Sequence, residues 1–327
     1  MKFRTEIKIP EYEKRIEHHH KILTIGSCFA ENMGAYFSKY KFSVSENPFG
    51  VLYNPASIYN SVKLLTGEKK FGKQDLIYDQ GEWHSFYHHS DFSHHNAEEC
   101  LKCINSSLAE TKKFIEQTDW IIVSLGTSFV YEHKDRNIIV SNCHKIPGKE
   151  FNRFMLSVDK NEKYLKDTVE LISGLNKNTK VLFTVSPVRH WKDGAVNNQL
   201  SKASLLLAVD NTVKQNGNCF YFPSYEIVLD ELRDYRFYKE DLLHPNELST
   251  GYIWEKLKES LLSADCVSSI NEISKVISAA NHKVRNPFSE KHKLFVRKNL
   301  EMLEELSAKY PYINFENEYK SFNAKIK

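Results

Sequence analysis

The chain has 327 residues, of which 41% are hydrophobic and 13% aromatic, a composition typical of a folded globular protein with a substantial core. Its formal charge is only +3, which argues against nucleic acid or an anionic membrane as a partner. Residues 1–8 are rich in charge and lack the apolar core of a signal peptide, and no run approaches the roughly 18 apolar residues of a membrane span. The six cysteines are scattered along the chain, which favours reduced thiols over disulfide bonds. We therefore expect a soluble, cytoplasmic protein.

The first predicted element is a buried parallel strand that ends in a serine turn. Residues 22–25 form an apolar run rich in β-branched side chains, and Gly26 ends it. From Ala30 the apolar residues follow helical spacing, so Ser27 lies in a sharp turn from strand to helix. The first N–H groups of a helix are unpaired and partly positive, and they can stabilise a developing oxyanion. Such turns also bind phosphates or simply cap helices.

Strand and helix patterns then alternate along the chain. The loop 47–55 is rich in rigid turn residues, and residues 66–96 are irregular, aromatic and rich in histidine. The other elements that we predict are strands beginning at 120, 181 and 219, and helices at 56–65, 97–117, 158–175, 198–216 and 246–262. This alternation predicts a three-layer α/β/α sandwich with a mostly parallel sheet.

The strand pattern stops near residue 264. Residues 268–282 and 289–309 read as two helices, and we expect a disordered tail after them. We therefore divide the chain into an α/β domain over residues 1–263 and a C-terminal helical extension over residues 264–327.

Asp241 and His244 are the strongest chemical partners for Ser27. A serine hydroxyl is a poor nucleophile until a base removes its proton, and a carboxylate that holds the base in the correct tautomer improves it. An aspartate and a histidine three residues apart in one turn can supply both roles. The spacing is common by itself, and the serine after the first strand makes it more specific.

These residues belong to a set of motifs that resembles the GSCFA domain family. The run from Gly26 to Ala30 matches the motif that names the family, and residues 20–262 contain further similar blocks, which begin at Asn47, Ser124, Asn142, Ser186 and Asp241. That family is similar to the SGNH/GDSL hydrolases, which have a flavodoxin-like fold. The resemblance implies Ser27 as nucleophile, His244 as general base and Asp241 as its orienting carboxylate.

The same resemblance implies oxyanion donors from the Ser27 N–H, the Gly50 N–H and the Ser128 side chain. SGNH enzymes usually have asparagine at the last position, and a serine hydroxyl is shorter and less fixed. This departure leaves room for acyl transfer as well as hydrolysis. Polar groups expected at the same sheet edge are candidates for substrate binding, with loop bracing or ion pairing as the alternative: Gly126, Thr127, Asn142, His144, Lys145, Arg189 and His190.

Two other readings concern cysteine and histidine. Cys28 is an alternative nucleophile because a helix N-terminus lowers the pKa of a thiol, although we favour Ser27. Cys100 and Cys103 have zinc-like spacing without a second pair, so structural thiols are the simpler reading. The histidines of the aromatic region could hold a metal, but pocket lining or solvated loop positions are the ordinary explanations: His84, His88, His89, His94 and His95.

The sequence thus predicts an SGNH-like serine hydrolase or O-acyltransferase that acts on a small-molecule or carbohydrate ester through an acyl-enzyme. The reaction needs no cofactor or metal. One alternative is a carbohydrate- or ligand-binding protein of the same fold, with the aromatic residues 83–95 as stacking surfaces. A phosphate-binding role at the Ser27 turn is weaker, because the chain lacks a glycine-rich loop and an acidic metal cluster. The sequence leaves the oligomeric state open.

Overall fold

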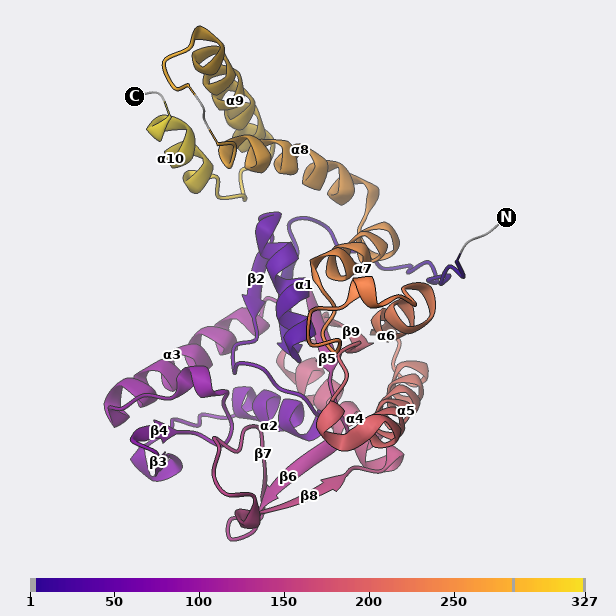
Figure 1. Cartoon of the computed structure of the whole chain (residues 1–327). Coiled ribbons are helices and arrows are strands. Elements are labelled where there is room, and N and C mark those ends of the chain that lie inside the picture. Colours follow the sequence, from indigo (N-terminus) through magenta and orange to yellow (C-terminus); the bar gives the residue numbers. More distant parts are fainter. Residues whose placement is uncertain (1–3, 284–285, 326–327) are drawn as a thin grey trace.

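A computed structural model describes residues 4–283 and 286–325 (Figure 1). Its centre is a five-stranded sheet in the order β10-β9-β5-β1-β2, in which every neighbouring pair is parallel. The bounds of these strands are β1 Lys21–Gly26, β2 Ser43–Glu46, β5 Trp120–Leu125, β9 Lys180–Val185 and β10 Cys219–Tyr221. The chain leaves β1 toward β2 and later returns to its other side at β5. Open α/β sheets bind ligands at such a reversal, beside the carboxyl ends of the strands.

Helices cover both faces of this sheet, as predicted. One face packs against α2 (Pro55–Thr66), α3 (Ala97–Ile115), α4 (Val158–Leu175) and α5 (Gly194–Lys214). The other face packs against α1 (Cys28–Lys39) and α7 (Glu247–Leu261). The three-layer α/β/α sandwich is therefore confirmed.

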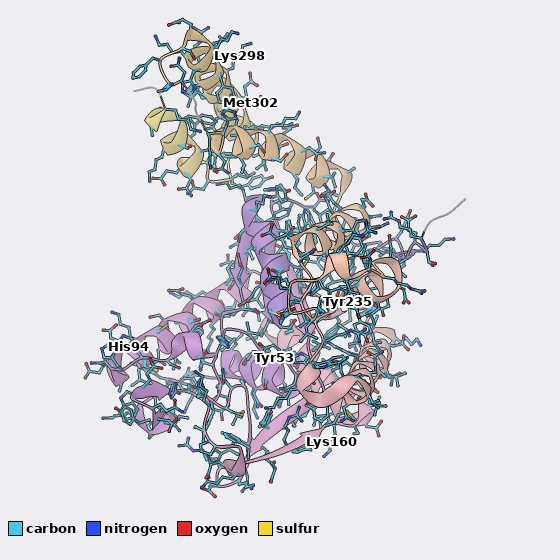
Figure 2. The ribbon with its side chains drawn as sticks, in the orientation of Figure 1. Tyr53, His94, Lys160, Tyr235, Lys298 and Met302 are labelled. Atoms are coloured by element: carbon cyan, nitrogen blue, oxygen red, sulfur yellow. The ribbon has the colours of Figure 1, made fainter. Side chains whose placement is uncertain are left out.

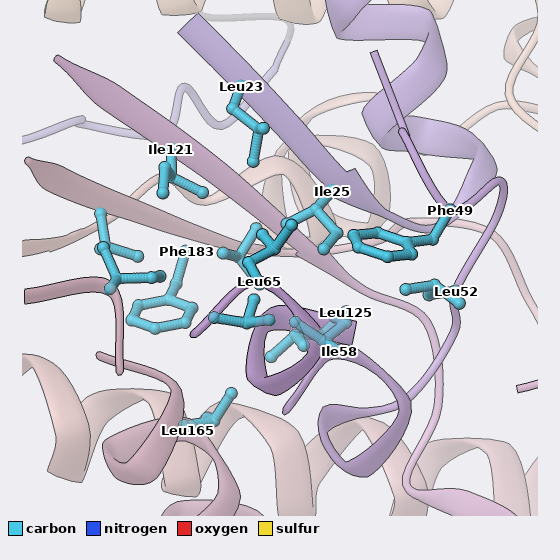
Figure 3. Packing of buried hydrophobic residues seen from close by; sticks show 14 of the residues in the cluster. Leu23, Ile25, Phe49, Leu52, Ile58, Leu65, Ile121, Leu125, Leu165 and Phe183 are labelled. Atoms are coloured by element: carbon cyan, nitrogen blue, oxygen red, sulfur yellow. The ribbon is translucent and has the colours of Figure 1, made fainter. Parts of the chain in front are cut away.

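The alternation of side chains along β1 explains this arrangement. Leu23 and Ile25 point to one face, where Figure 3 shows them packed with Ile58 and Leu65 of α2. Ile22 points to the other face, in the cluster that contains Phe37 of α1. Strands that are buried on both faces read as continuous apolar runs, which is why the sequence indicated β1, β5 and β9 clearly.

Several smaller strands were not predicted. They form a two-stranded sheet of β3 (Ile77–Asp79) and β4 (Glu82–His84), and a three-stranded antiparallel sheet of β6 (Phe129–His133), β7 (Ile138–Val140) and β8 (Phe151–Met155). The edge strand β2 was missed as well, because its side chains are mostly polar and partly exposed. These short strands lack the long apolar run that marks a central strand. The short helix α6 covers Ser224–Glu226.

The C-terminal part is helical, with α8 (Ala264–Ala280), α9 (Glu290–Lys309) and α10 (Glu316–Ala324) around a core of its own. The expected disordered tail is wrong over α10, because Phe322 is fully buried in that core. The helices contact the α/β part near the start of β1. There Lys41 Nζ pairs with Glu318 at 2.8 Å, and His18 stacks on Tyr310.

Within the described residues, no helix is both long and apolar enough to cross a membrane.

Candidate active site

The turn from β1 to α1 has the sharp geometry that its sequence indicated. Gly26 adopts a φ of +133°, and a Cβ atom at this position would lie 2.1 Å from the backbone oxygen of Ser124. Its N–H donates to Asn47 Oδ1 at 2.9 Å. Only glycine fits such a φ and so close an approach to backbone.

Ser27 is the N-cap of α1, and its side chain points back toward the sheet. Its Oγ accepts a hydrogen bond from the Phe29 N–H at 3.3 Å and lies 2.8 Å from Ser124 Oγ. Its own N–H donates to the Ser124 backbone oxygen at 2.9 Å. The residue is 1% exposed. Ser27 therefore ties the start of α1 to the end of β5.

Cys28 is the first residue of α1 and is half-buried. Burial raises the pKa of its thiol, and the Glu31 carboxylate acts in the same direction, whereas the ammonium groups of Lys202 and Lys239 lower it. Its N–H has no backbone hydrogen-bond acceptor in the part of the chain that the structure describes. The first turn of α1 thus presents Cys28 beside charged groups of two other segments.

Asp241 and His244 form a hydrogen-bonded pair within one tight turn. His244 Nδ1 lies 2.6 Å from Asp241 Oδ2, and Asp241 Oδ1 accepts the N–H groups of Leu243 and His244, each at 2.9 Å. These backbone hydrogen bonds, and then the His244 side chain, lower the pKa of Asp241 to about 2. Leu242, between them, has the unusual φ of +60°. The carboxylate is therefore ionised and fixes the orientation of the imidazole.

The Asp241–His244 pair lies at the same end of the sheet as the β1–α1 turn. The Arg189 N–H, four residues after the end of β9, donates to Leu243 O at 3.4 Å, and the Lys239 N–H donates to His244 O at 2.7 Å. The charge of Lys239 also lowers the pKa of the Cys28 thiol. The structure does not join His244 to Ser27: no hydrogen bond links their side chains among the described residues. His244 Nε2 has no hydrogen-bond partner there either.

Each of the three predicted oxyanion donors has an internal acceptor. The Ser27 N–H donates to Ser124 O, and the Gly50 N–H donates to Asn47 O at 2.7 Å. Ser128 Oγ donates to Ser201 O at 2.9 Å and accepts from Asn161 Nδ2 at 3.0 Å. These groups stabilise the fold of the turn and of the strand ends.

Gly126 and His190, two predicted substrate-binding residues, lie together with Tyr53. The N–H groups of Gly126 and Thr127 both donate to Tyr53 O, at 2.8 and 2.9 Å. The His190 ring packs edge-on against Tyr53 at 5.4 Å between centroids. Burial lowers the pKa of His190 to about 4, and the charges of Lys202 and His244 add to this effect. Figure 2 labels Tyr53, which these residues contact.

Arg189 lines a cavity of about 560 Å³ that also touches Asp241. The wall of this cavity contains basic, acidic and aromatic groups, among them Arg233, Asp234, Trp191, Tyr235 and Tyr238. Trp191 and Tyr235 are 52% and 74% exposed. An open pocket with apolar rings and guanidinium groups therefore borders the Asp241–His244 turn.

Asn142, His144 and Lys145 have no contact with the β1–α1 turn among the described interactions. Asn142 Oδ1 accepts the His144 N–H at 2.8 Å, and His144 Nε2 lies 2.8 Å from Ser85 O. The His144 ring stacks on His84, and burial lowers its pKa to about 4. Lys145 is exposed. The contacts of Asn142 and His144 are those of a braced loop, the alternative role for this segment.

The other histidines of the aromatic region also have structural contacts. His84 Nδ1 lies 2.7 Å from Ser93 Oγ, and the buried His88 places Nδ1 2.9 Å from Ser85 Oγ. Figure 2 shows His94 far from Tyr53. Across residues 4–283 and 286–325, no group of three or more His, Cys, Asp or Glu side chains is arranged to hold a metal ion.

Lys202 is a site residue that the sequence analysis missed. It is 1% exposed, and its Nζ donates to the backbone oxygens of Gly126 and Ser186, both at 2.6 Å. These oxygens follow the ends of β5 and β9. Burial lowers the pKa of Lys202 to about 7. The sequence could have indicated this residue, because a lysine three residues before Leu205 falls on the apolar face of the predicted helix.

The comparison with family models decides the family. The model of the GSCFA family matches residues 21–257, and a model for the C-terminal domain of GSCFA domain proteins matches residues 273–327. The protein belongs to the GSCFA family. A search of curated proteins finds no significant match.

Solved structures of low similarity include a Streptococcus pneumoniae protein provisionally described as a platelet activating factor, with 12% identity over 74% of this chain and 84% of that one (TM-score 0.39). A family 3 carbohydrate esterase from Clostridium thermocellum matches with 12% identity, 79% and 99% coverage, and a TM-score of 0.33. An acetyl xylan esterase from Butyrivibrio proteoclasticus matches with 12% identity, 78% and 66% coverage, and a TM-score of 0.31. These values are too low to transfer an activity to the GSCFA chain.

Proposed function

We propose that this GSCFA protein is an SGNH-like hydrolase or O-acyltransferase that acts on a small-molecule or carbohydrate ester, such as an acetylated sugar. The observation that carries the proposal is the 2.6 Å contact between His244 Nδ1 and Asp241 Oδ2. Because no hydrogen bond to Nε2 of the imidazole is found among the described residues, this nitrogen is available to accept a proton. The pair stands at the carboxyl end of the sheet, where such folds position their chemistry.

The proposed reaction begins with a nucleophile on the β1–α1 turn, for which the family resemblance implies Ser27. His244 removes its proton, and the nucleophile attacks the ester carbonyl to give a tetrahedral oxyanion next to the partly positive start of α1. The alkoxide leaves with the proton held by His244, and an acyl-enzyme remains. Water or an acceptor hydroxyl, activated by the same base, then releases the acyl group.

The cavity beside Asp241 is the proposed substrate pocket. Its exposed rings, Trp191 and Tyr235, suit a sugar or another ring compound, and Arg189 suits an acidic substituent. We assign the whole reaction to residues 1–263 and propose that residues 264–327 form a separate helical extension. We also propose that the acyl group is acetyl and that a carbohydrate carries it.

A specific observation favours a second function, that of a ligand-binding protein without turnover. The Ser27 hydroxyl and all three predicted oxyanion donors already have internal hydrogen-bond partners. Two of the residues suggested as stacking surfaces argue against this alternative, because Phe86 and His88 are 2% and 1% exposed, whereas Trp83 is only partly buried.

Hydrolysis of short chromogenic esters and of acetylated sugars tests the proposal. We expect turnover by the wild type and a loss of about 10²-fold or more in His244→Ala. His95→Ala is the matched control, because His95 is an exposed histidine outside the proposed site. A folded wild type without turnover on any of these esters, together with saturable binding of the same sugars, would support the binding protein instead.

A further inference from the structure

We infer that Cys28, rather than Ser27, is the nucleophile, and that Ser27 is a positioning residue that holds the start of α1. The inference rests on the proposed function and specifies the class of enzyme: a thiol acyl hydrolase or transferase. It comes from the different surroundings of two adjacent side chains.

The surroundings of Ser27 are those of a structural residue. Its Oγ is occupied on two sides, by the Phe29 N–H and by the hydroxyl of Ser124, and the residue is 1% exposed. To attack a substrate, this side chain would have to give up the helix cap and turn away from β5. An N-cap hydroxyl that accepts a helix N–H already has a sufficient structural role.

Cys28 has the access that Ser27 lacks. It is half-buried, and no hydrogen bond to its Sγ from another residue is found among the described residues. Its N–H is the first of α1, lacks a backbone acceptor among the described residues and interacts with the thiol of Cys28 itself, so the nucleophile would bring its own oxyanion donor. The Ser27 N–H, by contrast, is bound to Ser124 O.

The electrostatic surroundings of Cys28 connect it with the Asp241–His244 turn. The charge of Lys239, whose N–H donates to His244 O, lowers the pKa of the thiol from that turn, and the charge of Lys202 lowers it from the buried side of α5. The Glu31 carboxylate, which also lies in the first turn of α1, opposes both by raising the pKa of the thiol, and the Tyr53 phenol is also within electrostatic range. Because burial and Glu31 keep the pKa of the thiol raised, Cys28 is protonated at rest and needs a general base.

The chemical steps balance with His244 as that base. His244 Nε2 accepts the thiol proton while Sγ bonds to the carbonyl carbon, and the C–O bond of the ester then breaks as the alkoxide takes the proton. This leaves a thioester on Cys28. A water molecule gives a proton to His244 and attacks the thioester, the C–S bond breaks, and the thiolate recovers the proton. The net reaction consumes one ester and one water and gives an acid and an alcohol.

The decisive experiment locates the acyl group on the wild-type enzyme. Incubation with p-nitrophenyl acetate, acid quenching and peptide mass mapping should find the acetyl group on Cys28, and neutral hydroxylamine should remove it as it does a thioester. An acetyl group on Ser27 that resists neutral hydroxylamine would overturn the assignment. This measurement does not depend on any variant folding.

The turnover of single-residue variants tests the assignment of Cys28 independently. Cys28→Ala should reduce turnover by about 10³-fold or more. Cys103→Ala is the matched control, since Cys103 is an exposed cysteine of α3. Ser27→Ala should lose the cap and lower the melting temperature by about 2–4 °C, while turnover stays within about tenfold.

The two proposals fail in different ways. If His244→Ala abolishes hydrolysis while Cys28→Ala remains as active as the wild type, the cysteine assignment is wrong and the proposed function stands. If the folded wild type hydrolyses no ester and gains no acetyl group, the enzyme proposal fails and the cysteine assignment fails with it.

Discussion

Ser27 Oγ lies 2.8 Å from Ser124 Oγ, so the two strands at the reversal of the sheet are joined by a buried pair of hydroxyl groups at their carboxyl ends. Each hydroxyl is the hydrogen-bond partner of the other, and both residues are buried. The contact fixes the direction in which α1 leaves the sheet, and with it the position of Cys28. Ser27, which its motif marks as a catalytic candidate, thereby stabilises the structure of the turn.

Replacing Ser124 tests this relationship directly. Ser124→Ala removes one partner of the buried pair, and we expect a loss of about 1 kcal/mol in the free energy of unfolding. If Ser27 only positions the helix, turnover should change by less than about tenfold. Denaturant unfolding and ester hydrolysis measured on the same preparation check both. A large rise in turnover on release of the Ser27 hydroxyl would argue for Ser27 as nucleophile.

Asp241→Asn should reduce turnover by about 10²- to 10⁴-fold, because the amide no longer holds the imidazole in the correct tautomer. The pKa of Asp241 is about 2, so the carboxylate stays ionised down to about pH 3 and cannot cause a change of rate above that value. Rate profiles between pH 4 and 9 for the wild type, Asp241→Asn and the exposed control Asp210→Asn provide the measurement. An Asp241→Asn enzyme as active as Asp210→Asn would refute the role of the pair.

Buried histidines should destabilise the protein in acid. Burial lowers the pKa of His88 to about 3, whereas an unfolded histidine titrates near 6.5. Between these values the unfolded state binds more protons, so stability is full above about pH 6.5 and falls as the pH drops toward 3. The slope for one such group approaches about 1.4 kcal/mol per pH unit. Urea unfolding of wild type and His88→Gln at pH 7, 6 and 5 should show a smaller slope in the variant, and equal slopes would contradict the prediction.

Lys202 should make the free energy of unfolding depend on pH in the alkaline range. Its pKa is about 7 in the folded protein and about 10.5 when unfolded, so between these values the unfolded state holds the extra proton. Stability from this group therefore rises as the pH increases from 7 to 10. We expect the difference in free energy of unfolding between wild type and Lys202→Met to grow over this range. A difference that stays constant with pH would show that the lysine does not titrate there.

Gly26→Ala should be among the most damaging single changes. A methyl group at this φ of +133° would meet the Ser124 backbone oxygen at 2.1 Å, and backbone cannot move aside cheaply. We expect a loss of about 3 kcal/mol or more, or failure to fold. The matched control is Gly174→Ala in α4, where a Cβ meets nothing within 4 Å, so the thermal stability should be retained or slightly raised. Comparable melting temperatures for the two variants would be inconsistent with this geometry.

The sequence predicted the layers of the fold because their signals are local. The apolar runs of β1, β5 and β9 and the helical period of α4 each determine one element. Strands such as β6 and β8 were missed, because their pairing depends on contacts between segments some twenty residues apart that no short pattern records.

The candidate site was predictable to a similar extent. The spacing of Asp241 and His244 is a local pattern, and the structure has the hydrogen bond that it suggested. Which of Ser27 and Cys28 faces outward depends on the residue at which α1 begins, and a shift of one residue changes the answer. The role of Lys202 depends on two carbonyl groups from distant strands. Tertiary contacts of this kind leave only a weak trace in a single sequence.

The C-terminal helices contact the α/β part through Lys41 and His18, beside the amino end of β1. The candidate site lies at the opposite end of the same strand, whose six residues span about 20 Å. Figure 1 shows α9 and α10 on that far side of the molecule. A partner bound to these helices would therefore leave the mouth of the cavity uncovered.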